Sequence, residues 1–290
     1  MRVALIGPGA IGGAVGGTIA GQGHDVEFCV RTPFDSIRVE RPQHNIEEPA
    51  TCHIDPAGLA GPFDAVILAV KAHQTAPAAD WLRTVDAAVP VFVLQNGVEQ
   101  VAMTEPHVSP GAPVVPTVVN LPASRLGPGH IRIGSQTGRL TVPAGGDVLA
   151  TLLNGSWIDV QVVDDWATPA WQKLMMNAAM GGVGTLTSTD NRVFDDDEAR
   201  DLAIALMHEV AAVARAEGAH IAEGDPEKIL DVVRKNASGH AASIVVDRRA
   251  GRPTEWQVRN AAIGRIGRTH GIATPLNDLV TTLIRLGEPT

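Results

Sequence analysis

The segment MRVALIGPGAIGGAVGG at residues 1–17 decides the fold class. Residues 2–6 form a short apolar run typical of a buried strand, and a helix-like stretch follows from Ala10 to Gln22. Gly7, Gly9 and Gly12 between them give the pattern G-x-G-x-x-G, which gains its specificity from standing between a strand and a helix. The alternative is a glycine-rich turn that binds nothing.

In a dinucleotide site, each of these glycines has a separate physical task. The first permits the tight turn, the second lets the backbone approach a pyrophosphate, and the third allows the helix to pack closely on the strand. The pyrophosphate then lies at the helix N-terminus, where backbone N–H groups point outward. The segment therefore predicts a cofactor-binding turn made of Gly7, Gly9, Ala10, Ile11 and Gly12.

The rest of the first half alternates strands with helices, which predicts a parallel sheet covered on both faces. The expected further strands lie at residues 25–30, 65–70, 91–95 and 114–119, followed by a strand pair at 130–133 and 139–142. After about Asp165 the pattern becomes helical, at residues 171–183, 199–217, 225–236, 241–249, 254–269 and 277–286. We expect an α/β protein, with an N-terminal Rossmann-type NADP-binding domain at 1–165 and an all-helical substrate and catalytic domain at 166–290.

Residues after the second, third and fourth expected strands bear on the cofactor. An acidic residue at the end of strand two favours NAD, whereas Arg accommodates the 2′-phosphate of NADP. Glu27 comes too early in the strand and Arg31 follows it, which predicts NADPH; a solvated surface Arg is the alternative. Lys71 and Asn96 follow the next two strands and are candidates to donate to the nicotinamide ribose or to a substrate oxygen. Asn96-Gly97 is also an ordinary turn dipeptide.

Composition narrows the function class. The net charge of -9 argues against a nucleic-acid partner, and Cys29 and Cys52 match neither a disulfide framework nor a metal motif. No run reaches the length of a membrane span and no signal segment opens the chain, so we expect a cytoplasmic enzyme without a metal. Of the 23 basic residues only four are Lys, at positions 71, 173, 228 and 235. Lys can tune its pKa and transfer a proton, whereas Arg effectively cannot.

One of these lysines lies in an apolar setting. Lys173 and Asn177 are four apart on an expected helix and share a face among apolar neighbours. Lys173 is then either a snorkelling surface residue or a placed acid. Ser243 and Asp247 are also four apart, and Glu255 stands where the next expected helix begins, a position that acidic residues favour on structural grounds alone.

At this point the chain resembles the ketopantoate reductase (2-dehydropantoate 2-reductase) family along nearly its whole length. The matching segments are GPGAIGG at 7–13, VRTP at 30–33, VKAHQ at 70–74, QNGV at 95–98, WQKLMMNAA at 171–179, Asn191, SIVVDRRAGRPTE at 243–255 and HGIATP at 270–275.

The resemblance implies NADPH-dependent reduction of a 2-oxo acid, with ketopantoate as the first expectation. It implies that Lys173 is the general acid, assisted by Asn177 and Glu255. It further implies that Arg31, Lys71 and Asn96 bind NADPH beside the glycine turn. The substrate would be bound by Asn96, Asn177, Asn191, Ser243 and Glu255.

Two positions depart from the family pattern. Gly181 stands where the family usually carries a second Asn, and His240 replaces a further Asn shortly before Ser243. Both changes fall on the substrate side, so a reductase of a different 2-oxo acid is an alternative. A non-enzymatic NADP-sensing protein is another, and self-association into a homodimer also stays open.

Overall fold

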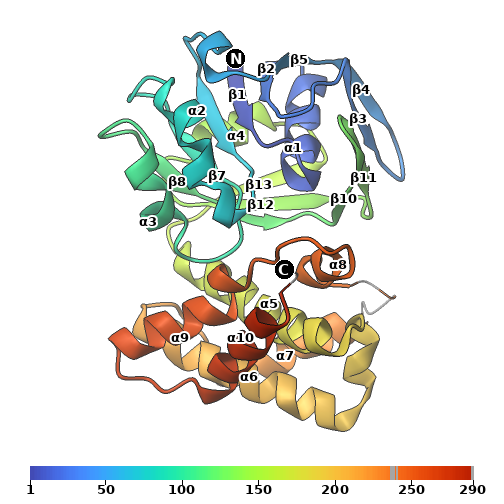
Figure 1. Ribbon diagram of the computed structural model, residues 1–290, viewed down its shortest axis with the longest axis vertical. Helices are drawn as coiled ribbons and strands as arrows, with labels where there is room; N and C mark the ends of the chain where they lie inside the picture. The colour runs from blue at the N-terminus through green and yellow to red at the C-terminus, as the bar shows by residue number, and fades with distance from the viewer. Residues whose placement is uncertain (236–238, 240, 289–290) are drawn as a thin grey trace. The chain divides into compact units, whose positions relative to one another are not determined.

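The protein is described by a computed structural model that covers residues 1–235, 239 and 241–288. The chain separates into two compact units (Figure 1). The first comprises Met1–Gln95 and Gln100–Trp166, and the second comprises Asn96–Glu99 and Ala167–Thr290. That residues 1–165 and 166–290 act as an NADP domain and a substrate domain stays a prediction.

A six-stranded parallel sheet forms the centre of the first unit, in the order β5-β2-β1-β6-β7-β8. Its strands are β1 (Arg2–Ile6), β2 (Asp25–Cys29), β5 (Thr51–His53), β6 (Ala65–Leu68), β7 (Val91–Val93) and β8 (Val114–Pro116). Both faces are buried: Val3 and Leu5 pack with helix α1 (Ala10–Gly21), whereas Ala4 and Ile6 pack with Leu82 of α2 (Ala79–Arg83). This burial explains why the central strands read as continuous apolar runs. The predicted α/β fold class is confirmed.

Two smaller sheets complete the first unit. One has the order β10-β11-β3-β4 and the other β13-β12-β9. Their strands are β3 (Ser36–Glu40), β4 (Ile46–Pro49), β9 (Val118–Asn120), β10 (Ala123–Gly127), β11 (His130–Ile133), β12 (Gly138–Val142) and β13 (Ile158–Val162). The remaining helices of this unit are α3 (Gln100–Thr104) and α4 (Asp147–Leu152), with short 3-10 turns at Pro56–Gly58, Ala72–Gln74, Ala76–Ala78 and Glu105–His107.

Two sequence-based expectations about these strands are wrong. The expected strand at 114–119 is split, because the chain leaves the first sheet after Pro116 and enters another at Val118. Between them the Thr117 N–H is shared by the Val93 carbonyl of β7 at 3.1 Å and the Gln100 side-chain oxygen at 2.8 Å. The expected strand pair is also absent: β11 pairs with β10 and β3, whereas β12 pairs with β9 and β13.

The second unit is helical over its described residues. It contains α5 (Ala167–Thr187), α6 (Asp197–Ala216), α7 (Asp225–Lys235), α8 (Ser243–Arg249), α9 (Asn260–Thr269) and α10 (Pro275–Leu286), with 3-10 turns η5 (Asn191–Asp195) and η6 (Trp256–Val258). Side chains from α5, α6, α9 and α10 share one apolar core. The expected single helix at 254–269 is wrong, because Arg259 has a non-helical backbone (φ -113°, ψ -114°) and separates η6 from α9.

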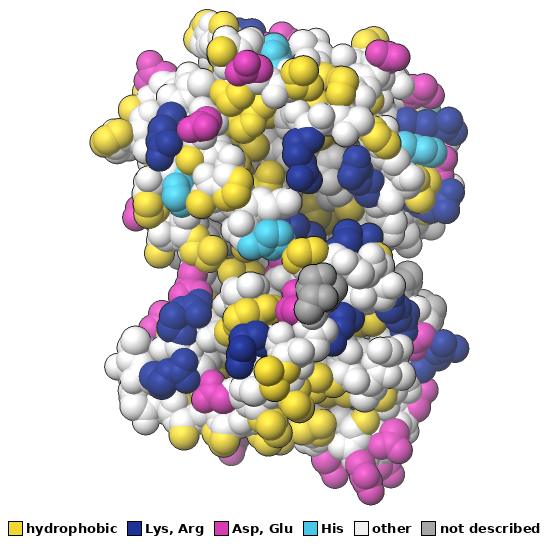
Figure 2. All heavy atoms as spheres, in the orientation of Figure 1, with side chains coloured by type: hydrophobic (Ala, Val, Ile, Leu, Met, Phe, Trp, Pro, Cys, Tyr) yellow, Lys and Arg dark blue, Asp and Glu magenta, His cyan; other side chains and the backbone are white. Residues whose placement is uncertain are grey.

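The surface agrees with the acidic composition. On the face drawn in Figure 2, Lys and Arg side chains are scattered among acidic, apolar and uncharged groups rather than gathered into one basic surface. Within the described ranges, no helix combines the length and apolar character needed to cross a membrane.

Candidate functional site

The glycine turn of the first unit joins β1 directly to α1. Gly7 has φ +85°, a conformation that favours glycine, and its N–H donates to the Cys29 carbonyl at 3.3 Å. A Cβ on Gly12 would lie 2.4 Å from the Gly7 carbonyl oxygen and 2.8 Å from the Ala69 Cβ. A Cβ on Gly9 would meet nothing within 4 Å. Gly7 and Gly12 are therefore required by the protein's own packing, whereas Gly9 leaves open space beside the backbone.

The start of α1 suits a phosphate group. Gly9 is the N-cap and has no side chain to accept from the first-turn N–H groups. The residues Gly7 to Ile11 are half-buried rather than covered. A helix N-terminus with free donors and a partial positive charge attracts anions. Two observations show that the turn suits the pyrophosphate of a dinucleotide: the helix end has no capping side chain, and the space beside Gly9 is open.

Two basic side chains follow strands next to this turn. Arg31 comes two residues after β2 and is exposed, and Lys71 comes three residues after β6 and is half-buried. Because β2, β1 and β6 are parallel neighbours, both residues lie at the same sheet edge as the glycine turn. The backbone N–H of Lys71 donates to the Gln74 side chain at 3.3 Å, which fixes the start of the loop.

Glu27, the acidic residue of β2, has a structural role. Its carboxylate is ion-paired with Arg2 and accepts from the His53 ring at 2.7 Å. Its side chain is nearly buried. Both carboxylate oxygens are therefore engaged inside the unit, in keeping with its mid-strand position.

A charged cluster lies in the second unit, on segments that are far apart in the sequence. Glu255 is only 3% exposed, and its Oε2 accepts from the Asn96 side-chain amide at 3.0 Å. Asn96 follows β7 but belongs to the second unit together with Gly97, Val98 and Glu99. Gly97 has φ +98°, and a Cβ there would lie 3.0 Å from the Val258 carbonyl oxygen. The Asn96-Gly97 turn therefore packs against the segment that follows Glu255.

Lys173 is the titratable centre of this cluster. It lies on α5 and is half-buried, and its pKa is lowered to about 7, first because burial disfavours its ammonium form and next because of the positive charge of Arg259. The negative charge of Glu255 opposes this shift. An amine with a pKa near neutrality can both donate and accept a proton at physiological pH. Asn177 lies one helical turn further along α5 and is half-buried.

Arg259 is a member of this cluster that the sequence did not reveal. It is 1% exposed, and burial lowers its pKa while Glu255 and Asp247 raise it. Its Nη2 donates to the Ser243 hydroxyl at 2.9 Å. The only sequence signal was its position inside the expected helix at 254–269, where an Arg is unremarkable in an Arg-rich chain.

The other expected substrate residues have more peripheral positions. Ser243 begins α8 and is exposed, although its hydroxyl accepts from the buried Arg259. Asn191 begins η5 and is half-buried. Gly181 lies on α5 within the described chain, whereas His240 falls outside the described residues. The structure thus joins Asn96 to Glu255 and Arg259 to Ser243, with Lys173 in the field of both charged residues.

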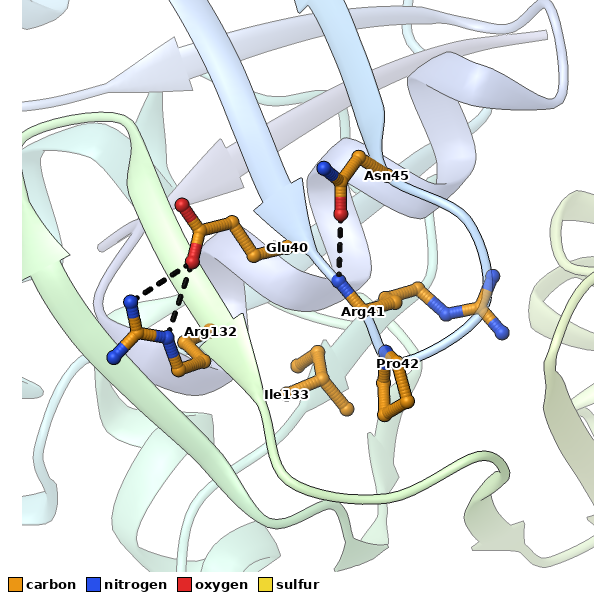
Figure 3. A pocket seen from close by; sticks show the side chains of 6 residues that line it. All are labelled: Glu40, Arg41, Pro42, Asn45, Arg132 and Ile133. Carbon is orange, nitrogen blue, oxygen red and sulfur yellow. Dashed lines mark hydrogen bonds and ion pairs between the residues drawn. The ribbon is translucent and has the colours of Figure 1, made fainter.

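A separate pocket of about 300 Å³ lies in the first unit (Figure 3). Its lining residues are Glu40, Arg41, Pro42, Asn45, Arg132 and Ile133. The Glu40 carboxylate accepts from Arg132 at 3.0 Å and from His130 at 2.8 Å, and the Asn45 side chain accepts from the Arg41 backbone. Because Glu40 is engaged by Arg132 and His130, and Arg41 donates to the Gln136 carbonyl and lies over the Trp157 ring, we assign this pocket no role in the chemistry.

Comparisons with known proteins bear on both units. The family model described as ketopantoate reductase PanE/ApbA matches residues 3–147, and its C-terminal counterpart matches residues 165–288. A 2-dehydropantoate 2-reductase of Mycobacterium tuberculosis (strain H37Rv) is 37% identical over 97% of this chain and 96% of its own. One from Caulobacter vibrioides is 38% identical over 97% of each chain.

A solved structure agrees with these sequence matches. The PanE/ApbA family ketopantoate reductase of Ralstonia eutropha JMP134 has a TM-score of 0.90 and 27% identity, covering 99% of this chain and 98% of its own. Two family models together span most of the chain, and the curated relatives match it nearly end to end. This chain belongs to the ketopantoate reductase PanE/ApbA family.

Proposed function

We propose that this protein reduces ketopantoate (2-dehydropantoate) to pantoate with NADPH, and that Lys173 is the general acid. The observation that carries the proposal is the Lys173 ammonium, whose pKa near 7 arises from burial and from Arg259 beside it. Family membership and the names of the relatives support the same reaction.

The cofactor is held by the first unit. NADPH, when bound, supplies a hydride to the carbonyl carbon of the substrate. The Gly7-to-Gly12 turn and the start of α1 bind its pyrophosphate, and Arg31 binds the 2′-phosphate. Lys71 lies at the same sheet edge and binds the cofactor as well. Asn96, which belongs to the second unit, is a further cofactor ligand of the proposal.

The proton comes from the second unit. As the carbonyl carbon is reduced, negative charge grows on its oxygen, and the Lys173 ammonium stabilises that charge and then protonates it. Glu255 favours the protonated form of Lys173 and is itself held by the Asn96 amide. Asn177, one turn from Lys173, orients the substrate with Asn191 and Ser243. A cytoplasmic homodimer completes the proposal, and light scattering of the purified protein checks its mass.

The test is direct. Purified protein is mixed with NADPH and ketopantoate, and the loss of NADPH absorbance is followed against a panel of other 2-oxo acids. We expect turnover with ketopantoate as the best substrate. No turnover of any 2-oxo acid would sink the reductase assignment, and tight NADPH binding without reduction would favour a sensor.

A second candidate is the same reaction on a different 2-oxo acid. Gly181 supports it, because the position usually filled by an Asn side chain in this family has none here. Faster turnover of another member of the panel than of ketopantoate selects this candidate.

A further inference from the structure

Arg259 carries more unused hydrogen-bonding capacity than a buried arginine normally does. A guanidinium presents five N–H donors. Here Nη2 donates to Ser243, while Nε and Nη1 are buried and have no hydrogen-bond partner among the described residues. Leaving charged donors buried and unpaired is costly, so native proteins normally satisfy them. The unpaired donors therefore point to an acceptor that completes the site.

The charges around Arg259 show what kind of acceptor fits. Asp247 is the acceptor of two hydrogen bonds from Arg252, both at 3.0 Å, and Glu255 accepts from Asn96. Both carboxylates are buried and committed to these partners. Neither reaches Nε or Nη1 of Arg259. A small carboxylate that enters from outside is the acceptor that matches a guanidinium in charge and in planar geometry.

The neighbours of Arg259 give the orientation of such a ligand. Ser243, which accepts from Nη2, is exposed at the start of α8, whereas Nε and Nη1 are buried, so a ligand would approach the guanidinium past the Ser243 hydroxyl. Lys173 lies near enough for the charge of Arg259 to lower its pKa. In a 2-oxo acid the carboxylate is bonded directly to the keto carbon. The Arg259 guanidinium therefore suits the carboxylate oxygens of the substrate, and the Lys173 ammonium suits the neighbouring keto oxygen.

Gly181 supplies the space that the guanidinium occupies. A Cβ at position 181 would lie 3.2 Å from Nη1 of Arg259 and 2.9 Å from the Ile244 Cγ2. Any side chain there would compete with the arginine for the same volume. The departure at 181 and the presence of Arg259 thus belong together: the glycine allows a buried guanidinium to lie against α5.

We propose that Arg259 binds the carboxylate of the 2-oxo acid substrate, with Gly181 making room for its guanidinium. Nη1 and the Ser243 hydroxyl donate to the carboxylate, while the Ser243 oxygen continues to accept from Nη2. This places the keto oxygen toward Lys173. The inference rests on the proposed reductase function and adds Arg259 as a residue that selects substrates by their carboxylate.

The test compares ketopantoate with its primary amide, which keeps the keto group and loses the charge. Arg259→Lys keeps a charge without the planar fork, and Arg259→Met removes it. We expect KM for the acid to rise roughly 30- to 1000-fold in Arg259→Met, with a smaller rise in Arg259→Lys. Wild type, Arg259→Lys and Arg259→Met should all reduce the amide equally poorly. The preference for the acid over the amide should therefore disappear in Arg259→Met. A purely structural role would lower turnover of the acid and of the amide in parallel.

Gly181→Ala and Gly182→Ala form a matched pair on the same helix. A Cβ at 182 would lie 3.0 Å from Val280 and away from the Arg259 guanidinium. We expect Gly181→Ala to raise KM for the acid and Gly182→Ala to leave the preference for acid over amide unchanged. If Arg259→Lys and Gly181→Ala prefer the acid over the amide as strongly as wild type does, the inference is overturned.

Calorimetric titration of ketopantoate into the NADP⁺-bound protein separates this inference from the reductase proposal. Binding that weakens in Arg259→Lys supports the carboxylate site even if wild type shows no turnover. If wild type turns over ketopantoate and binding of the acid is unaltered in Arg259→Lys and Arg259→Met, the reductase proposal stands. The same result rejects Arg259 as the carboxylate ligand.

Discussion

The turn after β1 and the charged cluster around Lys173 both suit anionic groups, but they are built from different material. The turn consists of backbone: three glycines and an uncapped helix end within six residues. The cluster consists of side chains from residues 96, 173, 243, 255 and 259, which are brought together by four segments of the second unit. Backbone N–H groups can bind an anion without changing their protonation state near neutral pH, whereas a cluster of charged side chains can shift the pKa of one of its members. This difference is the basis for proposing that the first binds the cofactor and the second transfers the proton.

The largest effect should come from removing the titratable group of the cluster. Lys173→Ala should lower kcat by about 10²–10⁴-fold, the usual contribution of a general acid. NADPH affinity should change little, because the turn lies in the other unit. Steady-state rates and fluorescence titration of NADPH measure the two quantities.

Two controls sharpen this result. Lys228→Ala removes an exposed lysine that pairs with Asp225 at 3.2 Å, and it should leave kcat unchanged. Lys173→Arg keeps the charge but cannot readily release a proton. Nearly full activity in Lys173→Arg would mean that charge alone, and not proton donation, is the contribution of this position.

The second effect tests the charged side chain at the sheet edge. Arg31→Ala should weaken NADPH binding by about 10- to 100-fold, the worth of a hydrogen bond to a charged group. NADH, which lacks the 2′-phosphate, should bind nearly as well as before. Isothermal titration with both cofactors provides the comparison. Equal losses for NADPH and NADH would show that Arg31 does not read the phosphate.

Local patterns account for the parts that the sequence predicted well. The β1-turn-α1 segment is contiguous, so strand, glycine spacing and helix could be located together, and the long helices α5 and α6 appear within a few residues of expectation. The β3–β4 hairpin was missed although Ser36–Glu40 alternates polar and apolar residues, because that strand is only five residues long and its partner Ile46–Pro49 does not repeat the alternation. The pairing of β11 with β3 joins segments about 90 residues apart, which no local pattern encodes.

The cluster was only partly predictable for the same reason. Lys173 was found because lysine is rare here and because the segment resembles a family motif. Arg259 was missed because it stood inside the expected helix at 254–269, whereas the structure breaks the helix at this residue and buries its side chain beside Ser243. Side chains that meet only through tertiary packing have no characteristic spacing in the sequence from which their contact could be predicted.

A smaller effect distinguishes the two functions of the glycines in the turn. Gly12→Ala should lower the free energy of unfolding by about 1–3 kcal/mol, because its Cβ would meet the Gly7 carbonyl and Ala69. Gly9→Ala should keep the stability and lose NADPH affinity, since the space beside Gly9 is open. Denaturant unfolding and NADPH titration separate the two. Gly127→Ala, also with open space around it, is the control for both measurements. Unimpaired NADPH binding by Gly9→Ala would argue against a close approach of the pyrophosphate.

The last effect concerns stability rather than catalysis, and it follows from the sign of the Lys173 shift. Its pKa is lowered from 10.5 to about 7, so between these values the unfolded chain binds a proton that the folded protein has released. Stability therefore rises with pH across this window, and below pH 7 the folded protein bears the full cost of a desolvated ammonium. Lys173→Met should be more stable than wild type at pH 6, and the difference should shrink as pH rises toward 10. Thermal melts of both proteins across this range measure it. A difference that stays constant with pH would place the Lys173 pKa near its ordinary value and remove the physical basis for its role as an acid near neutrality.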